Sequence, residues 1–302
     1  MDILTHPAVA ALLREQSNHS SGRSPCAVFD CDGTVIKGDI GEAMFYRQIE
    51  RFHFRRSPAD VWPDHPQKGL LDSLYRKLGG MTETGRGASA EFGAFADLLV
   101  SWYVDQIAGG QVIKACADIV RLLAGYTPAE VRGIARATFE DERAAPLSTR
   151  RLGSRSLPRG VRFLREGRDL AGELIRRGFE VWAVSGSNRW SVEPVFETLG
   201  VPPDRVIGLE MEVREGVLTT EEVEPVPIRE GKIAALRLRT PAAPLLVVSD
   251  SKNDIPLFLT AKDLKIRINS RNRDTADFFR SPGVEQDSTW VLVERPEIIE
   301  AS

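Results

Sequence analysis

Two aspartates with one residue between them are the first feature of the chain that could do chemistry. Asp30 and Asp32 open the sequence Asp-Cys-Asp-Gly-Thr, directly after the apolar run 26–29. Side chains two residues apart on an extended strand project to the same side, so the two carboxylates would repel each other unless a cation or a shared proton stabilised them. Magnesium prefers oxygen ligands and tolerates phosphate oxygens among them. The pair therefore predicts a magnesium site.

The same motif has two other interpretations. A calcium-binding EF-hand loop requires glycine at its sixth position and glutamate at its twelfth. Counted from Asp30, these positions hold Val35 and Gly41, which excludes that type of loop. A polar turn between a strand and a loop, without any chemistry, stays open when the motif is taken alone.

Three more polar motifs stand at the ends of predicted strands or at the start of a predicted helix. Ser185 comes directly after the apolar run 179–184, Lys232 begins a helical pattern, and an acidic loop follows the apolar run 245–248. Ligand sites in parallel α/β sheets lie beyond the carboxyl ends of the strands. Taken singly, a serine there is usually a turn or cap residue, and a lysine is usually solvated. The candidate site residues outside the first motif are Ser185, Gly186, Lys232, Asp250, Asn253 and Asp254.

In this order, the motifs resemble those of the haloacid dehalogenase superfamily. The matching segments are residues 26–42 and 179–258, whereas residues 43–160 match only by their position as a helical cap. The resemblance implies a Rossmann-like parallel sheet and magnesium-dependent phosphoryl transfer. Asp32 favours a phosphatase over a dehalogenase, because a halide leaves without being protonated. One position departs from the pattern, since Ser249 stands where many members have glycine.

The resemblance also implies a role for each candidate residue. Asp30 attacks phosphorus and carries an aspartyl-phosphate, while Asp32 protonates the leaving oxygen and later deprotonates water. Lys232 neutralises charge on the phosphoryl group in transit. The other implied roles are metal binding by Asp30, the backbone carbonyl of Asp32 and Asp250, phosphoryl binding by Ser185 and Gly186, and support by Asn253 and by Asp254, which holds the metal's water or orients Lys232.

Residues 30–42 resemble the phosphoserine phosphatase-like branch of the superfamily. Members of this branch, which is related to the phosphocholine and phosphoethanolamine phosphatases, carry an acidic residue near the position of Asp39 that faces the amine of the substrate. Asp39 and Glu42 also fit a helix capping box, and the two roles are compatible. We therefore expect a small, amine-bearing phosphomonoester as substrate. The alternatives are a phosphomutase or phosphotransferase on the same scaffold and, with less support, a non-catalytic phospho-ligand-binding module.

The elements that must position these residues follow an α/β pattern. Strands that alternate with helices predict a doubly wound parallel sheet, here in a core of residues 1–38 and 160–302. Residues 206–217 predict a hairpin on that sheet, with its turn at Glu215 and Gly216. The predicted core strands are 26–30, 179–184, 245–248, 264–268 and 290–293, and the predicted core helices are 7–16, 169–177, 190–199 and 232–239.

Residues 39–159 predict an inserted helical cap domain. Apolar residues at helical spacing over 91–107 and a capping-box sequence at 127–130 support helices. The glycine-rich segment 85–90 predicts a loop, and the arginine-rich segment 149–168 predicts either a solvated hinge or an anion-binding segment. Aromatic residues of the cap either form its core or bind a quaternary ammonium group by cation–π contact; these are Phe45, Tyr46, Trp62, Trp102 and Tyr103.

The composition is ordinary for a soluble globular chain. Its 40 basic and 43 acidic residues give a net charge of −3, which provides no general attraction to nucleic acid. Three cysteines without a Cys-x-x-Cys pair indicate no disulfide framework and a reducing compartment. No apolar run approaches the ~18 residues of a membrane span. We expect a cytoplasmic protein whose partner is a small phosphomonoester rather than a nucleic acid or a membrane.

Overall fold

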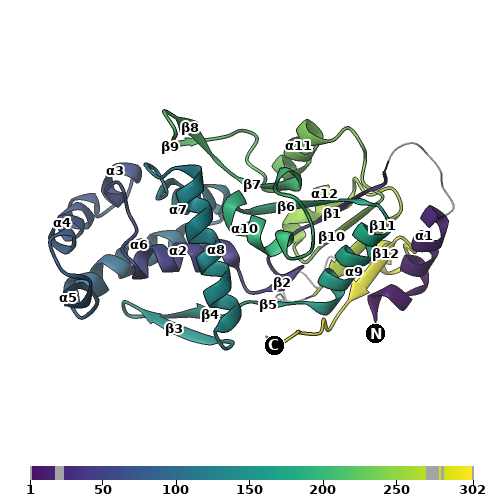
Figure 1. Cartoon of the computed structure of the whole chain (residues 1–302), viewed down its shortest axis with the longest axis horizontal. Helices are drawn as coiled ribbons and strands as arrows, with labels where there is room; N and C mark the ends of the chain where they lie inside the picture. The colour runs from purple at the N-terminus through teal and green to yellow at the C-terminus, as the bar shows by residue number, and fades with distance from the viewer. Residues whose placement is uncertain (1, 18–23, 270–278, 280–281, 301–302) are drawn as a thin grey trace. The chain divides into compact units, whose positions relative to one another are not determined.

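The chain folds into two compact units (Figure 1). The computed structural model describes residues 2–17, 24–269, 279 and 282–300. The sheet unit comprises residues 1–39, 161–208 and 224–302, and the helical unit comprises residues 40–160 and 209–223. The chain therefore passes from one unit to the other four times.

A six-stranded sheet forms the centre of the sheet unit, with strand order β12-β11-β10-β1-β6-β7. β1 pairs in parallel with β10 on one side and with β6 on the other, and β11 and β12 continue the sheet in parallel beyond β10. The predicted doubly wound α/β fold is confirmed. The strands are β1 (Cys26–Phe29), β6 (Glu180–Asn188), β7 (Val206–Leu209), β10 (Leu246–Ser249), β11 (Leu264–Ile268) and β12 (Trp290–Val293).

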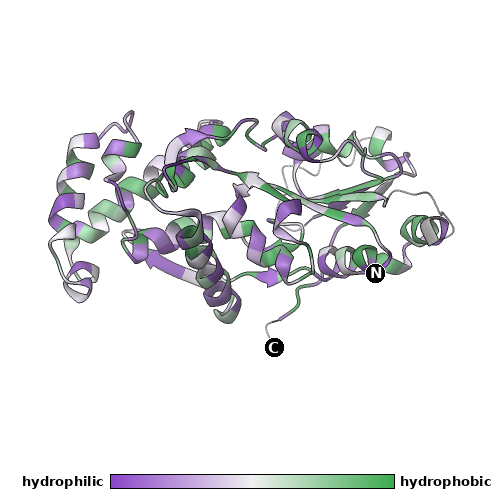
Figure 2. Cartoon of the chain, turned by 45° about the horizontal axis from the view of Figure 1, so that its top comes forward, coloured by the Kyte–Doolittle hydropathy of each residue, from purple (hydrophilic) through white to green (hydrophobic). Residues whose placement is uncertain are grey.

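Helices cover the sheet on both faces (Figure 1). On one face, Val28, Val184 and Val247 form an apolar cluster with Leu236 of α11 and Phe258 of α12. Because side chains alternate along a strand, the residues between them face the other side, where α9 packs against β1 and β6. The strands are hydrophobic over most of their length (Figure 2), as expected for a sheet covered on both faces.

The other elements of the sheet unit connect these strands. They are η1 (Ile3–Thr5), α1 (Pro7–Ser17), β2 (Ile36–Lys37), β5 (Arg162–Phe163), α9 (Arg165–Arg176), α10 (Arg189–Glu197), η2 (Pro203–Arg205), α11 (Glu230–Arg239), η3 (Lys252–Asp254), α12 (Ile255–Phe258) and α14 (Pro282–Glu285). β2 pairs with β5 in an antiparallel ladder. Close to this ladder, Gly167 of α9 approaches the chain so closely that a Cβ atom there would lie 2.3 Å from the carbonyl oxygen of Thr34.

The helical unit contains the helices that the sequence predicts between 39 and 144. Thr127 and Glu130 form the predicted capping box at the start of α8, each bonding to the backbone N–H of the other. The helices are α2 (Ile40–Glu50), α3 (Pro58–Val61), α4 (Lys68–Gly79), α5 (Glu83–Gly87), α6 (Ala90–Ala108), α7 (Val112–Arg121) and α8 (Pro128–Ala144), and the strands are β3 (Ser148–Leu152), β4 (Arg155–Arg159), β8 (Met211–Arg214) and β9 (Val217–Glu222).

Two segments of this unit differ from the prediction. Most of 85–90 is not a loop, because α5 begins at Glu83 with its N-cap Thr82 bonded to the N–H of Gly85, and α6 begins at Ala90. The segment 149–168, predicted as a hinge or an anion-binding segment, consists largely of regular structure, because β3 and β4 pair as a hairpin and β5 and the start of α9 follow. Arg150 on the inner face of the hairpin is 9% exposed and forms ion pairs with Glu142 and Glu50. A buried arginine with two carboxylate partners serves the packing of this unit.

The predicted hairpin at 206–217 is partly wrong. β7 is the edge strand of the main sheet, whereas the hairpin is made by β8 and β9 and forms a separate two-stranded sheet. The cause is visible in the residue pattern. All four residues of β7 are buried, as in a strand covered on both faces, whereas Glu212 and Arg214 of β8 give it a polar face. The β8–β9 hairpin belongs to the helical unit.

Two of the five predicted cap aromatics bond to the same aspartate of the helical unit. Trp62 and Trp102 both donate from Nε1 to Asp118, to its backbone carbonyl oxygen at 2.8 Å and to its carboxylate at 3.1 Å. Lys114 lies over the ring of Trp102, with Nζ 5.0 Å from the ring centroid. The chain thus supplies its own cation to this tryptophan, and these two residues serve the packing of the helical unit.

The sequence also predicts no disulfide framework and no membrane span. All three cysteines lie among the described residues and none forms a disulfide; Cys26 and Cys31 are buried. Across the described helices, none combines the length and the hydropathy that crossing a lipid bilayer requires.

Candidate active site

The predicted nucleophile Asp30 lies directly after β1, in the middle of the sheet. Its N–H donates to the carbonyl oxygen of Val248 in β10 at 2.9 Å, so the pairing of the strands continues to this residue. The chain then turns sharply, because the N–H groups of Thr34 and Val35 both bond to the carbonyl oxygen of Cys31. This turn holds Asp30 at the carboxyl end of the strand, where parallel α/β sheets place their ligands.

A buried lysine joins Asp30 to the acidic loop that follows β10. Lys232 Nζ, on the first turns of α11, donates to Asp30 Oδ1 at 2.9 Å and to Asp254 Oδ2 at 2.7 Å. The three residues are 4%, 6% and 1% exposed, respectively. The cation thus lies between two carboxylates that are removed from water. Residues 202 positions apart in the sequence form one charged cluster.

The charges of this cluster are strongly perturbed. Burial raises the pKa of Asp30 to about 6, with Asp254 adding to the rise and Lys232 opposing it. Burial alone would lower the pKa of Lys232, but Asp254 and Asp30 together raise it above its usual value. Lys232 therefore keeps its proton, whereas burial makes Asp30 harder to ionise than an ordinary aspartate.

The second aspartate of the motif has a different partner. Ser187 Oγ donates to Asp32 Oδ2 at 2.6 Å, and the N–H of Ser187 donates to Ser185 Oγ at 3.1 Å. Ser185, which is 1% exposed, and Ser187 both lie in β6. The sequence interpretation named Ser185 and Gly186 but missed Ser187. The repeated serine in Ser-Gly-Ser was the available signal, since residues two apart on a strand share a side.

Ser249 is an exception to the family pattern with a clear structural use. Its Oγ donates to Asp254 Oδ2 at 2.6 Å, the same oxygen that Lys232 contacts. The N–H of Ser251 donates to Ser249 Oγ at 3.3 Å. A glycine at position 249 could make neither contact. Ser249 therefore helps to hold the carboxylate that fixes the lysine.

The remaining predicted residues are Asp250, Asn253, Gly186 and Asp39. Asp250 and Asn253 lie in the same loop as Asp254, and the N–H of Asn253 donates to Ser251 Oγ at 3.1 Å. Gly186 lies in β6, where a Cβ atom would be 3.2 Å from the side chain of Ile228. Asp39 is the last residue before α2. The structure thus brings Asp30, Lys232 and Asp254 together and pairs Asp32 with Ser187 of β6, while the chemical roles of all the predicted residues stay predictions.

Comparison with known families agrees with this arrangement. The profile of haloacid dehalogenase-like hydrolases matches residues 27–259, which is most of the chain and includes every motif described above. The chain belongs to the haloacid dehalogenase-like hydrolase family. The predicted family membership is therefore confirmed.

The similarity to a single curated protein covers a smaller part of this hydrolase. It is 36% identical to phosphoserine phosphatase SerB2 of Mycobacterium tuberculosis over 111 residues, which are 34% of this chain and 26% of that protein. The match thus spans about a quarter of the length of the curated relative.

Solved structures show the same fold. A conserved protein of unknown function from Anaerococcus prevotii DSM 20548 has a TM-score of 0.71 at 18% identity, with 94% of this chain and 91% of that chain covered. A second protein of unknown function, from Bordetella pertussis Tohama I, has a TM-score of 0.55 at 16% identity, with coverages of 89% and 97%. At these identities the likeness extends to the fold alone.

The predicted donor set of this haloacid dehalogenase-like hydrolase fits magnesium by its chemistry. Within the described residues, no three side chains of the His, Cys, Asp and Glu types are grouped as metal ligands. The predicted set needs fewer, namely the carboxylates of Asp30 and Asp250 and the carbonyl oxygen of Asp32. Magnesium typically takes one or two protein carboxylates and completes its shell with water and substrate phosphate. The raised pKa of Asp30 is consistent with a cation site, because a cation bound there would favour the ionised form of this buried carboxyl group.

Proposed function

We propose that this hydrolase is a magnesium-dependent phosphatase that uses Asp30 to cleave a small phosphomonoester. One observation carries the proposal: Lys232 Nζ lies between Asp30 and Asp254, all three buried, at the carboxyl end of the central strand. A buried cation beside a carboxylate is suited to a reaction in which negative charge arrives on a phosphoryl group. Membership of a hydrolase family supports the proposal.

In the first step, a carboxylate oxygen of Asp30 attacks phosphorus and the bond from phosphorus to the leaving oxygen breaks. Asp32 gives its proton to that oxygen, so the product leaves as an alcohol. The hydroxyl of Ser187, bonded to Asp32 Oδ2, fixes the orientation of this acid. Lys232 holds Asp30 in position and neutralises charge on the phosphoryl group.

In the second step, water attacks the phosphorus of the aspartyl-phosphate. Asp32, now ionised, takes a proton from this water, and the bond between phosphorus and Asp30 breaks, which releases inorganic phosphate and restores both aspartates. Magnesium, held by Asp30, Asp250 and the carbonyl oxygen of Asp32, would supply positive charge against the phosphoryl oxygens.

The proposed substrate is small and bears an amine. The partial similarity to a phosphoserine phosphatase supports this choice, as does the acidic residue Asp39. In the helical unit, the hydroxyls of Tyr46 and Tyr103 both donate to the carboxylate of Glu42, at 3.2 Å and 2.9 Å. Phe45 contacts both tyrosine rings, with centroids 5.6 Å and 5.7 Å away. These rings are 2%, 4% and 7% exposed, so they serve the packing of the helical unit.

Phosphate release from a panel of compounds tests the proposal. The panel contains phosphoserine, phosphocholine, phosphoethanolamine, sugar phosphates and a nitrophenyl phosphate, each with magnesium and with a chelator. We expect magnesium-dependent release that falls by at least about 10³-fold in Asp30→Asn. Lys252→Gln, which changes an exposed residue of the acidic loop, is the control. Release that persists in Asp30→Asn would refute the nucleophile, and interconversion of phosphorylated compounds with little free phosphate would indicate a mutase.

A further inference from the structure

The segment before α11 belongs to the sheet unit and borders the proposed active site on two sides. Ile228, which is 6% exposed, packs against β6, because a Cβ atom on Gly186 would lie 3.2 Å from its side chain. Lys232, four residues later, donates to Asp30 at 2.9 Å. Arg229 therefore lies between a contact with the strand of the predicted phosphoryl-binding residues and a contact with the predicted nucleophile.

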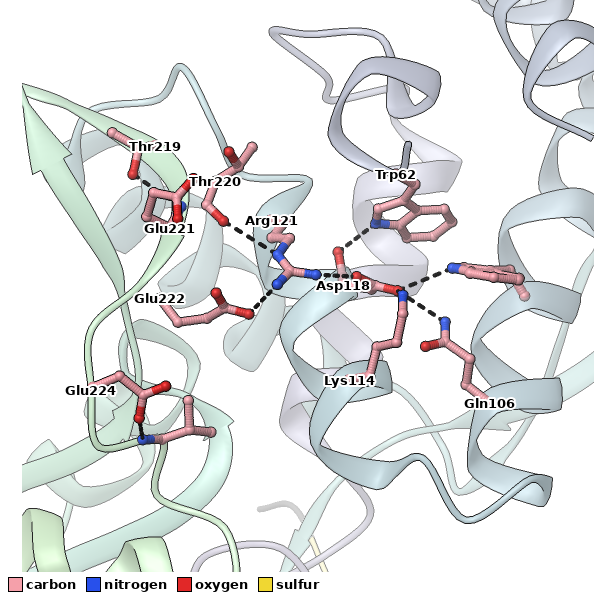
Figure 3. A network of polar contacts seen from close by, with 12 residues as sticks. Trp62, Gln106, Lys114, Asp118, Arg121, Thr219, Thr220, Glu221, Glu222 and Glu224 are labelled. Atoms are coloured by element: carbon pink, nitrogen blue, oxygen red, sulfur yellow. Dashed lines mark hydrogen bonds and ion pairs between the residues drawn. The ribbon is translucent and has the colours of Figure 1, made fainter. Parts of the chain in front are cut away.

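Hydrogen bonds shape the segment around Arg229. The carboxylate of Glu224 accepts the N–H of Val226 at 3.0 Å (Figure 3). The N–H of Ile228 donates to the carbonyl oxygen of Val226 at 2.8 Å, and the N–H of Gly231 donates to the carbonyl oxygen of Ile228 at 3.0 Å. The last of these bonds closes a turn that contains Arg229.

The backbone of Arg229 has a conformation that glycine adopts more easily. Arg229 is the N-cap residue of α11, with φ 54° and ψ −123°. A residue with a Cβ atom is strained there, whereas glycine is not. Non-glycine residues in strained conformations cluster at active sites and ligand clamps. The turn alone would favour glycine, so the use of arginine at this position lies in its guanidinium.

The guanidinium of Arg229 is available to a ligand. The residue is exposed, and in the part of the chain that the structure describes its side chain makes no hydrogen bond or ion pair. Lys232, the buried cation of the site, is engaged by Asp30 at 2.9 Å and by Asp254 at 2.7 Å. A substrate that brings its phosphoryl group to Lys232 therefore needs another cation for any second anionic group.

We propose that Arg229 is a specificity-determining residue that binds a second anionic group of the substrate, either a carboxylate or a further phosphoryl group. The proposal rests on the proposed function, because it takes the phosphoryl group to react at Asp30. A planar guanidinium donates two parallel hydrogen bonds to the oxygens of either group, a geometry that an ammonium group lacks. The preferred substrates are then phosphorylated acids or bisphosphates, and an amine-bearing member of this class is a phosphorylated amino acid.

Pairs of compounds that differ by one anionic group test the proposal. Phosphoserine carries a carboxylate that phosphoethanolamine lacks, and fructose 1,6-bisphosphate carries a phosphoryl group that fructose 6-phosphate lacks. In one of the pairs, the wild type should have the higher kcat/KM for the compound with the additional group. Arg229→Gln should lower that ratio of kcat/KM values roughly 10-fold, as expected for the loss of a hydrogen bond to a charged group. The change should appear mainly in KM, because the contacted group does not react.

Three further variants separate the guanidinium from other causes. Arg229→Gly removes the guanidinium and the backbone strain together, and it should lower the ratio as much as Arg229→Gln does. A change in Arg229→Gly alone would assign the effect to the backbone and overturn the proposal. Arg237→Gln and Lys252→Gln each remove an exposed positive charge, from α11 and from the acidic loop, and should keep the wild-type ratios. An equal loss in these two controls would show that general electrostatic attraction selects the substrate, which also contradicts the proposal.

The proposal and the proposed function fail in different ways. Phosphate release with the same ratios in the wild type, Arg229→Gln and Arg229→Gly would overturn the role of Arg229 and leave the phosphatase intact. If the wild type releases no phosphate from any compound, the proposed function fails. Calorimetric affinities of the full-length protein for the same pairs then decide about Arg229, and equal affinities or no binding in the wild type and Arg229→Gln would overturn its role.

Discussion

At the scale of single residues, the most consequential feature is the charge of Lys232 between two buried carboxylates. Removing one partner of a buried ion pair leaves an uncompensated charge, which typically costs about 3–5 kcal/mol. We therefore expect Lys232→Met to lower the free energy of unfolding by about that amount in metal-free buffer at pH 8, besides abolishing activity. Urea denaturation measures the change, and Lys252→Met, an exposed lysine in the acidic loop, is the control.

The same variant has a pH dependence with a definite sign. The pKa of Asp30 in the folded protein, about 6, is raised above its ordinary value of 3.8 by burial, even though Lys232 lowers it. Such a group stabilises the fold below pH 3.8 and loses that contribution as the pH rises through the folded value. Without Lys232 the pKa rises further, so the destabilisation should be larger at pH 8 than at pH 5. Equal losses at both values would contradict this account.

Membership of the charged cluster was predictable from the sequence where it depended on order along the chain. Asp30, Lys232 and Asp254 were found because each stands at the end of an apolar run or at the start of a helical pattern. Ser187 and Ser249 were not assigned roles, because the role of each depends on one hydrogen bond across the fold, to Asp32 and to Asp254. The repeated serine in Ser-Gly-Ser places Ser187 on the same side of the strand as Ser185, but it does not identify the partner across the fold.

At the scale of elements, the start of α11 carries backbone strain. Arg229, the N-cap residue, has φ 54° and ψ −123°, a conformation that favours glycine. Strain of this kind costs about 1–3 kcal/mol at a non-glycine residue. Arg229→Gly should therefore raise the free energy of unfolding by about 0.5–1 kcal/mol, since the flexibility of glycine in the unfolded chain offsets part of the gain.

A glycine elsewhere in the same helix is the comparison for that change. Arg237 is exposed on α11 and has helical geometry, so Arg237→Gly should lower stability by about 1 kcal/mol. Thermal unfolding distinguishes the two directions. A loss of stability in both variants would show that Arg229 is not strained in solution.

The packing of α3 and α6 contains a histidine that must stay neutral. His65 is 5% exposed, its ring lies against Trp62 and Trp102, and its Nδ1 accepts the N–H of Gln67 at 3.1 Å. Burial lowers the pKa of His65 below 6.5. The stability contributed by the neutral ring is complete above pH 6.5 and is lost as the pH falls through the lower, folded value.

Acid should therefore weaken the wild type more than a variant without this ring. Urea midpoints measured at pH 7 and pH 5 should differ less in His65→Gln than in the wild type, although the variant is less stable at pH 7. An unchanged difference between the two midpoints would exclude His65 as the titrating group.

Elements were predictable where burial alone determines the pattern. The apolar runs of β1, β10 and β11 are largely buried in the sheet, β12 at the edge is mostly half-buried, and all four were recognised from the sequence. The pairing of β8 with β9 was placed on the wrong sheet, because an alternating pattern indicates a strand with one buried face but not which partner covers that face. The β3–β4 hairpin was missed because its inward-facing Arg150 is polar, and its burial depends on the distant partners Glu142 and Glu50.

At the scale of the whole molecule, the sheet unit is assembled from three separate stretches of chain. β1 lies between β10 and β6, each from a different stretch, whereas β12 is at an edge. The free energy of local unfolding ranges from near zero at fraying edges to the global free energy of unfolding in a core strand. We expect backbone amides of β1 and β10 to exchange hydrogen far more slowly than those of β12. Exchange of β12 at the same rate as β1 would contradict this hierarchy.

The order of the sheet also has a consequence during synthesis of the protein. β1 ends at Phe29 and its neighbour β10 begins at Leu246, so more than two hundred residues separate two adjacent strands. A ribosome adding about 5–20 residues per second needs roughly 10–40 s to cover that distance. Until β6 begins at Glu180, the apolar strand that precedes the proposed nucleophile has emerged without either neighbour, while the whole segment 40–160 is made and can fold. After that, its side that pairs with β10 still stays open. The nascent chain therefore exposes a hydrophobic strand with at least one unpaired side for roughly 10–40 s and is a natural client for a chaperone that shields such segments.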